Sequence, residues 1–211
     1  MAFRGWPVEA VEFFEGLEAD NTKVYWRDHK AVYDRAVRAP MDELLAELAA
    51  EFGEGKVFRP YRDVRFSADK TPYKTNLAAM IGESGYVSLS AEGLSAGSGM
   101  YMLSGEALER YRRAVDDDVS GREVAAIVAA LTKAGYEATA HDVLKTVPRG
   151  YAKDHPRLDL LRHKGLIAWK TWPIGSWLGT RTVKARLVKL LHDASPLRAW
   201  LDLYVGPSGG S

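Results

Sequence analysis

Residues 59–76 carry the side chains of this chain that are best suited to hold an anion. The segment contains five basic residues and two acids, so its net charge is +3, and three aromatic residues and two prolines stiffen it. An arginine side chain recognises a phosphate or a carboxylate through two parallel hydrogen bonds. The sequence therefore predicts a basic pocket for an anionic ligand, formed by Arg62, Arg65, Lys70, Tyr73, Lys74 and, from a later segment, Arg149.

The same residues can instead form a structural network of ion pairs. If residues 58–66 are a strand, one face carries Phe58, Arg62, Val64 and Phe66. Arg62 then lies among apolar side chains and needs a partner, because an unpaired buried charge is costly. The partner is either a bound anion or a carboxylate such as Asp63 or Asp69. These two aspartates are also acid/base candidates if the protein is an enzyme, which the sequence leaves open. A proline at 72 disfavours a helix before it, so residues 69–74 are predicted to form a turn.

Residues 62–74 closely resemble the motif of a bacterial and fungal family catalogued as domain of unknown function 2461. Two weaker similarities are residues 20–33, where Tyr25-Trp26 replaces the family's usual Trp-Phe pair, and the late loop at residues 148–151 and 154–156. Together these segments span nearly the whole chain. The resemblance implies one α+β domain, and it implies no activity, because the family has no established biochemistry to carry over.

Composition excludes several kinds of site. The chain of 211 residues has no cysteine, which rules out disulfides, thiolate zinc sites and cysteine nucleophiles. Its five histidines are scattered without clustered acids, so we expect no metal and no cofactor. The first residues do not look like a secretion signal, and no apolar run approaches the roughly 20 residues of a membrane span. We therefore expect a soluble cytoplasmic protein that does not enter a membrane.

Charge is unevenly distributed along the chain, although the net charge is only +1. Residues 1–58 hold 7 basic and 12 acidic groups, whereas residues 160–192 hold seven Lys or Arg and no acid. Three tryptophans (Trp169, Trp172 and Trp177) are interleaved with these bases, a pattern that can stack single-stranded nucleic acid. Tryptophans in strands and loops are more often part of the core, so nucleic-acid binding ranks third among the functions considered. The sequence does not fix the oligomeric state.

Hydrophobic periodicity and turn residues predict the order of the elements. We expect helices at 7–18, 22–38 (with a cap at Asn21 or Thr22), 41–52, 105–115, 121–134, 156–164, 180–192 and 196–204. We expect strands at 77–81, 86–91 and 94–102 as an antiparallel meander, a further pair at 136–140 and 143–147, and one at 166–172. The fold class is therefore α+β: a single domain over residues 1–205, with helices mainly on one side of the sheet and a disordered tail at 206–211.

The hairpin at residues 86–102 has two unlike faces. A two-residue loop at Glu92-Gly93 pairs Ala91 with Leu94 on an apolar face and leaves small or polar residues on the other. That small-residue face is either the floor of a ligand pocket or a surface for helix packing. Gly93-Leu-Ser95-Ala-Gly97 matches the nucleophile elbow of hydrolases, but it lies inside a hairpin rather than between a strand and a helix. We therefore expect no serine-hydrolase activity.

Residues 145–164 form a second basic segment. Arg149 and Tyr151 are placed to contact a ligand, and His155 is an acid/base candidate. The interpretation that we favour for His155 is structural, with residues 154–156 capping the helix that follows. The leading functional hypothesis is a small-molecule binder or enzyme with a basic pocket for a phosphate- or carboxylate-bearing ligand. The alternative is a non-catalytic interaction module whose charged motif is a network of ion pairs.

Overall fold

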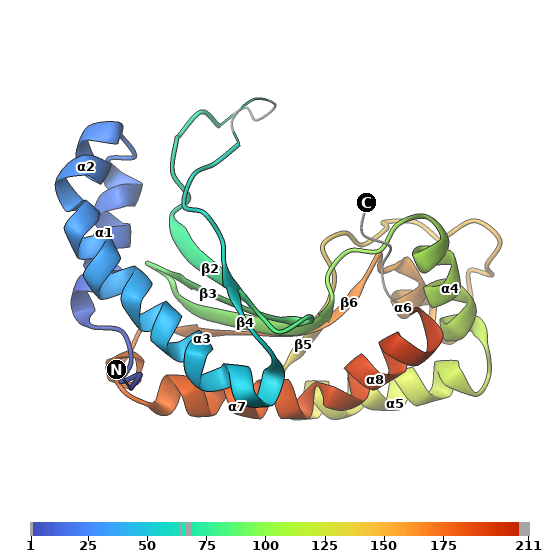
Figure 1. The fold of residues 1–211 in the computed structure, drawn as a ribbon. Helices are drawn as coiled ribbons and strands as arrows, with labels where there is room; N and C mark the ends of the chain where they lie inside the picture. The colour runs from blue at the N-terminus through green and yellow to red at the C-terminus, as the bar shows by residue number, and fades with distance from the viewer. Residues whose placement is uncertain (1, 64, 66–68, 207–211) are drawn as a thin grey trace. The chain divides into compact units, whose positions relative to one another are not determined.

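The computed structural model describes residues 2–63, 65 and 69–206, and it confirms the α+β class (Figure 1). Helices accompany a six-stranded antiparallel sheet, whose order among the described residues is β1-β2-β3-β4-β6-β5. The strands are β1 (Lys56–Val57), β2 (Asn76–Ile81), β3 (Gly85–Ser90), β4 (Gly93–Met100), β5 (Glu137–Thr139) and β6 (Leu166–Pro173). The three successive neighbours β2, β3 and β4 are the predicted meander.

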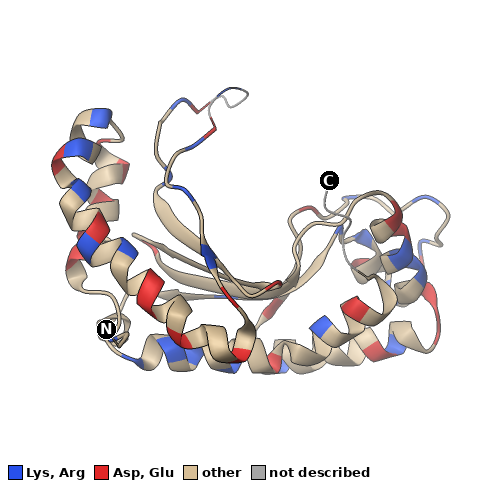
Figure 2. Ribbon diagram, in the orientation of Figure 1, with Lys and Arg blue, Asp and Glu red and all other residues tan. Residues whose placement is uncertain are grey.

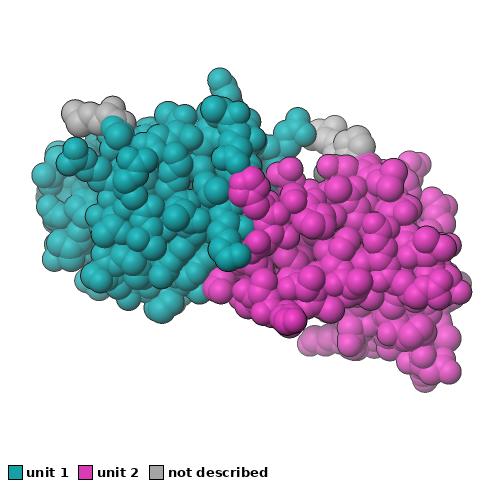
Figure 3. All heavy atoms as spheres, turned by 90° about the horizontal axis from the view of Figure 1, so that it is seen from below, with its two compact units in different colours: residues 1–96, 171–189 teal, residues 97–170, 190–211 magenta. Residues whose placement is uncertain are grey.

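The chain separates into two compact units (Figure 3). Unit 1 comprises residues 1–96 and 171–189, and unit 2 comprises residues 97–170 and 190–211. The division falls within β4, β6 and the seventh helix, α7 (Thr182–Asp193). The single domain expected over residues 1–205 stays a prediction, and residues 207–211 of the predicted tail lie outside the described residues.

Unit 1 begins with a nearly continuous helical stretch. Its helices are α1 (Val8–Ala19), α2 (Lys23–Val32), the π-helix η1 (Tyr33–Arg38) and α3 (Ala39–Phe52); later in the chain come the 3-10 helix η2 (Ser176–Gly179) and most of α7. Of the two residues predicted to cap α2, Asn21 and Thr22, the observed cap is Thr22, whose hydroxyl accepts a hydrogen bond from the Tyr25 amide at 3.2 Å. The expected helices 22–38 and 41–52 are not separated by a break at Pro40, because η1 leads directly into α3. The carbonyl of Val37, within η1, accepts a hydrogen bond from the buried Trp6 indole at 3.0 Å.

The meander of unit 1 has the predicted apolar face, but its second turn differs. Val87, Leu89 and Leu94 are fully buried. The two-residue loop is 91–92 rather than Glu92-Gly93, since β3 ends at Ser90 and β4 begins at Gly93. The predicted pairing of Ala91 with Leu94 is therefore wrong. Gly93 is required for another reason: it has a φ of +143°, and a Cβ there would overlap the backbone of β6.

Unit 2 contains α4 (Gly105–Asp116), α5 (Ser120–Lys133), α6 (Leu158–Arg162) and α8 (Ser195–Tyr204). The Trp200 indole donates a hydrogen bond to the Ser120 carbonyl at 3.0 Å, and both groups are buried. The predicted strand pair 136–140 with 143–147 is wrong. Strand β5 pairs with β6 instead, with Glu137 opposite Trp169. This long-range pairing joins β5 to a strand that contributes buried apolar side chains, and the local sequence cannot reveal such a partner.

No helix in the described part of the chain is long and apolar enough to cross a lipid bilayer.

Candidate functional site

The predicted site lies on a loop of unit 1 that extends the β1–β2 pair. We call residues 59–75 the charged loop; positions 64 and 66–68 lie outside the described residues, so the predicted strand positions Val64 and Phe66 are among those not described. Its two arms run antiparallel. The Lys74 amide donates to the Pro60 carbonyl at 2.8 Å, and the Arg62 amide donates to the Pro72 carbonyl at 2.9 Å. Figure 2 shows Lys and Arg on both arms of this loop.

One residue anchors the charged loop to the start of α2. The Tyr73 amide donates to the Asn21 side-chain oxygen at 3.0 Å, and the Asn21 side-chain nitrogen donates to the Tyr73 carbonyl at 3.0 Å. Tyr73 faces Tyr61 as an isolated bridge between the arms. The neighbouring backbone groups bond across the arms, so those of Tyr73 point outward, where Asn21 satisfies both. The amide side chain thus takes the place of a further strand.

Aromatic stacking completes this anchor. The Tyr73 ring lies parallel to the Trp26 ring, with 4.4 Å between centroids and 7° between planes. Tyr73 is only 5% exposed, whereas Tyr61, on the opposite arm, is 50% exposed. The part of Tyr73 that a ligand could reach is therefore small, and its ligand-binding role stays a prediction.

Two arginines of the charged loop are paired with aspartates of the same loop. The Arg65 guanidinium forms a bidentate pair with Asp63, at 3.0 and 2.7 Å, and its side chain is 76% exposed. Arg62 pairs with Asp69, and its side chain is 33% exposed. Arg62 is thus half-buried and has the carboxylate partner that the structural alternative requires. Exposed pairs of this kind contribute only about 0–1 kcal/mol each to stability.

Both aspartates are held in their ionised form. Hydrogen bonds from the Arg65 side chain and amide lower the pKa of Asp63 below its usual value. Hydrogen bonds from the amide and hydroxyl of Thr71, with a smaller contribution from Arg62, lower the pKa of Asp69. A general acid or base that works near neutral pH needs a pKa close to that pH. These shifts run in the opposite direction from the one that catalysis at Asp63 or Asp69 would require.

The remaining basic candidates lie in different settings. Lys70 is exposed on the charged loop, as is Arg59. The Lys74 ammonium lies 5.8 Å from the centre of the Phe58 ring, a cation–π distance. Arg149 belongs to unit 2, where it is exposed beside Gly150, whose φ is +92°. The structure thus gathers five of the six predicted ligand-binding residues on one loop of unit 1.

A comparison with protein families matches residues 9–200 to the family described as "Conserved hypothetical protein (DUF2461)". The chain belongs to this family. No curated protein and no solved structure matches the chain. The two DUF2461-like segments that contain Asn21 and Tyr73 are the ones that meet in the anchor, so their joint role here is to hold the charged loop against α2.

In the DUF2461 meander, small residues of β4 lie beside side chains of β6, the next strand of the same sheet. The Ser95 hydroxyl, inside β4, is 2.9 Å from the Thr171 hydroxyl. In unit 2, a Cβ at Gly97 would lie 2.6 Å from the Trp169 ring. Packing against β6 therefore accounts for the glycine at 97. Ser95 lies within a strand of a hairpin, as predicted, and not at a strand-to-helix elbow.

The late loop of unit 2 binds to the end of α4. The His155 Nε2 lies 3.1 Å from an Asp116 carboxylate oxygen, and its Nδ1 accepts a hydrogen bond from the Arg157 amide at 3.1 Å. Both ring nitrogens therefore have partners, and an acid/base role for His155 stays a prediction. Helix α6 begins at Leu158 rather than at the predicted Pro156, and the Arg157 amide just before it bonds to the His155 ring. Among the described residues, no group of three or more His, Asp or Glu is arranged to hold a metal ion.

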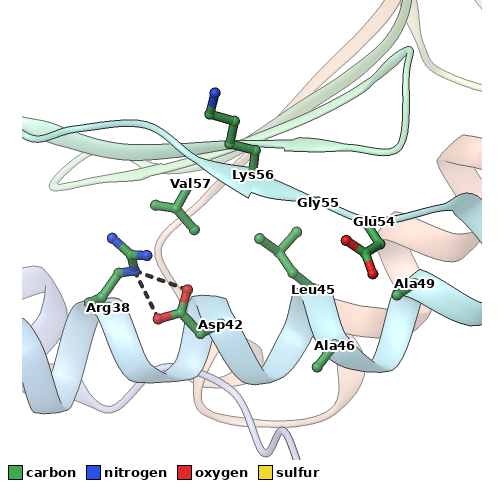
Figure 4. A pocket seen from close by; sticks show the side chains of 9 residues that line it. All are labelled: Arg38, Asp42, Leu45, Ala46, Ala49, Glu54, Gly55, Lys56 and Val57. Atoms are coloured by element: carbon green, nitrogen blue, oxygen red, sulfur yellow. Dashed lines mark hydrogen bonds and ion pairs between the residues drawn. The ribbon is translucent and has the colours of Figure 1, made fainter.

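A pocket that the sequence did not indicate lies in unit 1 between α3 and β1 (Figure 4). Its volume is about 420 Å³. Helix α3 contributes Leu45, Ala46 and Ala49 to its apolar wall, and Val57 of β1 lies opposite. Only the helical stripe of α3 was visible in the sequence, because two residues are too few to show the periodicity of a strand.

Proposed function

We propose that this protein is a non-catalytic binding module whose charged loop docks on an acidic polypeptide segment. The observation that carries the proposal is the anchor. Two hydrogen bonds with Asn21 and the stack on Trp26 fix the position of Tyr73, on one arm of a loop whose net charge is +3. A segment that is ordered before binding loses less conformational entropy when a partner docks, and this favours affinity.

The state of the aspartates supports binding over catalysis. Arg62 and Arg65 already have carboxylate partners on the same loop, and the pKa values of both carboxyl groups are lowered. An exposed Arg65–Asp63 pair is weak, so a partner's carboxylate can replace the aspartate at small cost. The same geometry that pairs arginine with aspartate within the loop fits a carboxylate brought by another chain.

An acidic polypeptide fits this surface better than a nucleic acid does. The basic side chains of this surface lie on a short loop, and of the two tyrosines on its arms Tyr61 is half-exposed whereas Tyr73 is buried. Binding of single-stranded nucleic acid draws on a basic groove and on several stacked rings. A small phosphate- or carboxylate-bearing ligand is the second candidate, which the same net charge of +3 favours.

The test measures binding of a fluorescent polyglutamate peptide by anisotropy at low and at physiological salt. The variant Arg65→Glu/Lys70→Glu reverses two charges of the loop. The control Arg122→Glu/Lys133→Glu makes the same change in net charge on exposed positions of α5. We expect the loop variant to bind at least about tenfold more weakly, the control to bind normally, and salt to weaken the native complex.

Equal losses of affinity in the loop variant and the control would show that the net charge of the protein, and not the charged loop, determines binding, and this would contradict the proposal. Tighter binding of an oligothymidine probe would point to nucleic acid instead. Thermal stabilisation by inorganic phosphate without peptide binding would favour the small-anion candidate.

A further inference from the structure

We propose that the groove between α3 and β1 binds an extended, uncharged peptide, which adds to the sheet as a strand beside β1. This surface is separate from the charged loop, and it takes a ligand of different chemistry. The proposal rests on an open strand edge, an apolar wall beside it and a balanced set of charges at the rim.

The strand edge comes first. In the sheet order of the described residues, β1 is a terminal strand with β2 as its one neighbour. The register places Lys56 opposite Met80 and Val57 opposite Ala79, and the Phe58 amide donates to the Ala78 carbonyl at 2.9 Å. Hydrogen-bonded and non-hydrogen-bonded pairs alternate in an antiparallel ladder. The amide and carbonyl of Val57 therefore point away from β2, toward the position of an added strand.

The apolar wall lies beside this edge. Leu45 extends toward β1 from α3, and the Val57 side chain extends toward α3 from β1 (Figure 4), while Ala46 and Ala49 of α3 also line the groove. Gly55 brings the chain close to the helix, since a Cβ at this position would lie 2.6 Å from a Leu45 methyl carbon and 2.8 Å from the Met80 carbonyl oxygen. A pocket of about 420 Å³ next to an unpaired strand edge has the features of strand addition, in which main-chain hydrogen bonds give affinity and a side-chain pocket gives selectivity.

The charges at the rim define the occupant. Arg38 and Asp42 neutralise each other through hydrogen bonds of 2.9 and 2.8 Å. Glu54 and Lys56 contribute one charge of each sign, so the lining carries no net charge. A neutral lining with an apolar wall favours an uncharged peptide that inserts a small apolar side chain. A second copy of this chain is a poorer occupant, because the two residues of β1 offer a very short ladder for a stable dimer, which buries roughly 1,200 Å² or more.

Selection from a displayed library of random, conformationally free peptides against the native protein tests the proposal. The variant Val57→Pro removes the outward amide while leaving the bonds between β1 and β2 in place, which edge strands tolerate. The variant Ala49→Trp fills the groove, and Ala50→Trp is its control, an exposed position on the same helix that does not line the groove. The melting temperature of every variant is measured first.

We expect the selection to enrich uncharged sequences that bind the native protein and the Ala50→Trp variant alike. Their affinity for Val57→Pro and Ala49→Trp should fall at least about tenfold, which corresponds to the loss of one or two main-chain hydrogen bonds and the side-chain contact. The Val57 amide should exchange its hydrogen more slowly in the complex. The proposal is overturned if no sequence is enriched, or if the enriched sequences bind Val57→Pro as tightly as the native protein. A dimer of the native protein that Val57→Pro dissociates would assign the edge to a second copy instead.

Discussion

Replacing Asn21 by leucine should release the charged loop from α2. The change removes the donor and the acceptor that satisfy the Tyr73 backbone, each at 3.0 Å. A hydrogen bond contributes about 0.5–1.5 kcal/mol net, so two of them amount to about 1–3 kcal/mol of unfolding free energy. For a chain of this size, a loss of 1 kcal/mol lowers the melting temperature by about 2–4 °C. We expect a fall of about 2–12 °C.

Two measurements separate the anchor from a general loss of stability. Urea unfolding gives the free energy, and hydrogen exchange followed by NMR gives the protection of the Tyr73 amide, which should fall more than that of the core amides. The control is Thr22→Ala, which removes the cap of α2 and should cost about 0.5–2 kcal/mol. Because Thr22 bonds to the Tyr25 amide and not to Tyr73, exchange at Tyr73 should stay as in the native protein.

The reasoning fails if Asn21→Leu costs less than about 0.5 kcal/mol, the lower end for a single hydrogen bond. It also fails if Asn21→Leu and Thr22→Ala speed hydrogen exchange of the Tyr73 amide equally. That result would show that the start of α2, and not the hydrogen bonds of Asn21, protects this amide. Asn21→Asp offers a finer comparison, because its carboxylate can accept from the Tyr73 amide but cannot donate to the carbonyl. Its stability should lie between those of the native protein and Asn21→Leu.

Two further outcomes follow from the geometry. The pKa of Asp69 is lowered by hydrogen bonds in the folded state, so the stability it contributes is present above its usual pKa of about 4 and is lost as pH falls through the lowered value. Acid unfolding below about pH 4 should therefore be less steep for Asp69→Asn, and an unchanged pH profile would show that Thr71 and Arg62 do not stabilise the carboxylate. Gly97→Ala should cost about 1–3 kcal/mol by urea unfolding, because the added Cβ meets the Trp169 ring at 2.6 Å. Combining Gly97→Ala with Trp169→Leu should recover part of the lost unfolding free energy, because the smaller side chain makes room for the added Cβ. If the losses of the two single variants simply add in the double variant, the Trp169 ring is not the source of the steric strain.

Local sequence signals predicted a helix or strand correctly where residues of that element itself determine its two ends. Pro7 precedes α1 and Gly53 follows α3, close to the limits of the expected helices 7–18 and 41–52, because proline fits the start of a helix and glycine its end. The meander followed from alternation, and its apolar face was correctly predicted. The turn at 91–92 was misplaced, because Gly93 looked like a turn residue and its real role, close approach to β6, depends on a strand more than 70 residues away.

The candidate site shows the same limit. The composition of residues 59–76 marked the charged loop, and Asp69, one of the two aspartates named as possible partners of Arg62, forms that pair, whereas Asp63 pairs with Arg65. Asn21 was expected only as a possible helix cap, because an asparagine before a helix usually has that role. Its bonds to Tyr73 join residues 52 positions apart, and nothing in either segment alone indicates them. The groove was missed for a related reason, since its two walls come from a helix and from a strand too short to recognise.

The anchor variant also separates the two binding proposals. Asn21→Leu loosens the charged loop without changing any of its charges, so an acidic peptide should still be attracted but should pay more conformational entropy on docking. If ordering the freed loop costs about 1–3 kcal/mol, the same range as the lost hydrogen bonds, affinity for polyglutamate should fall about 5- to 150-fold while its salt dependence stays the same. The proposed groove peptide contacts α3 and β1. The hydrogen bond from the Phe58 amide to the Ala78 carbonyl, which holds this part of the chain to β2, lies before the charged loop in the sequence. The affinity of the groove peptide should therefore not change. Loss of both activities in this variant would mean that the anchor supports unit 1 as a whole, and that neither surface can be assigned from binding data on loop variants alone.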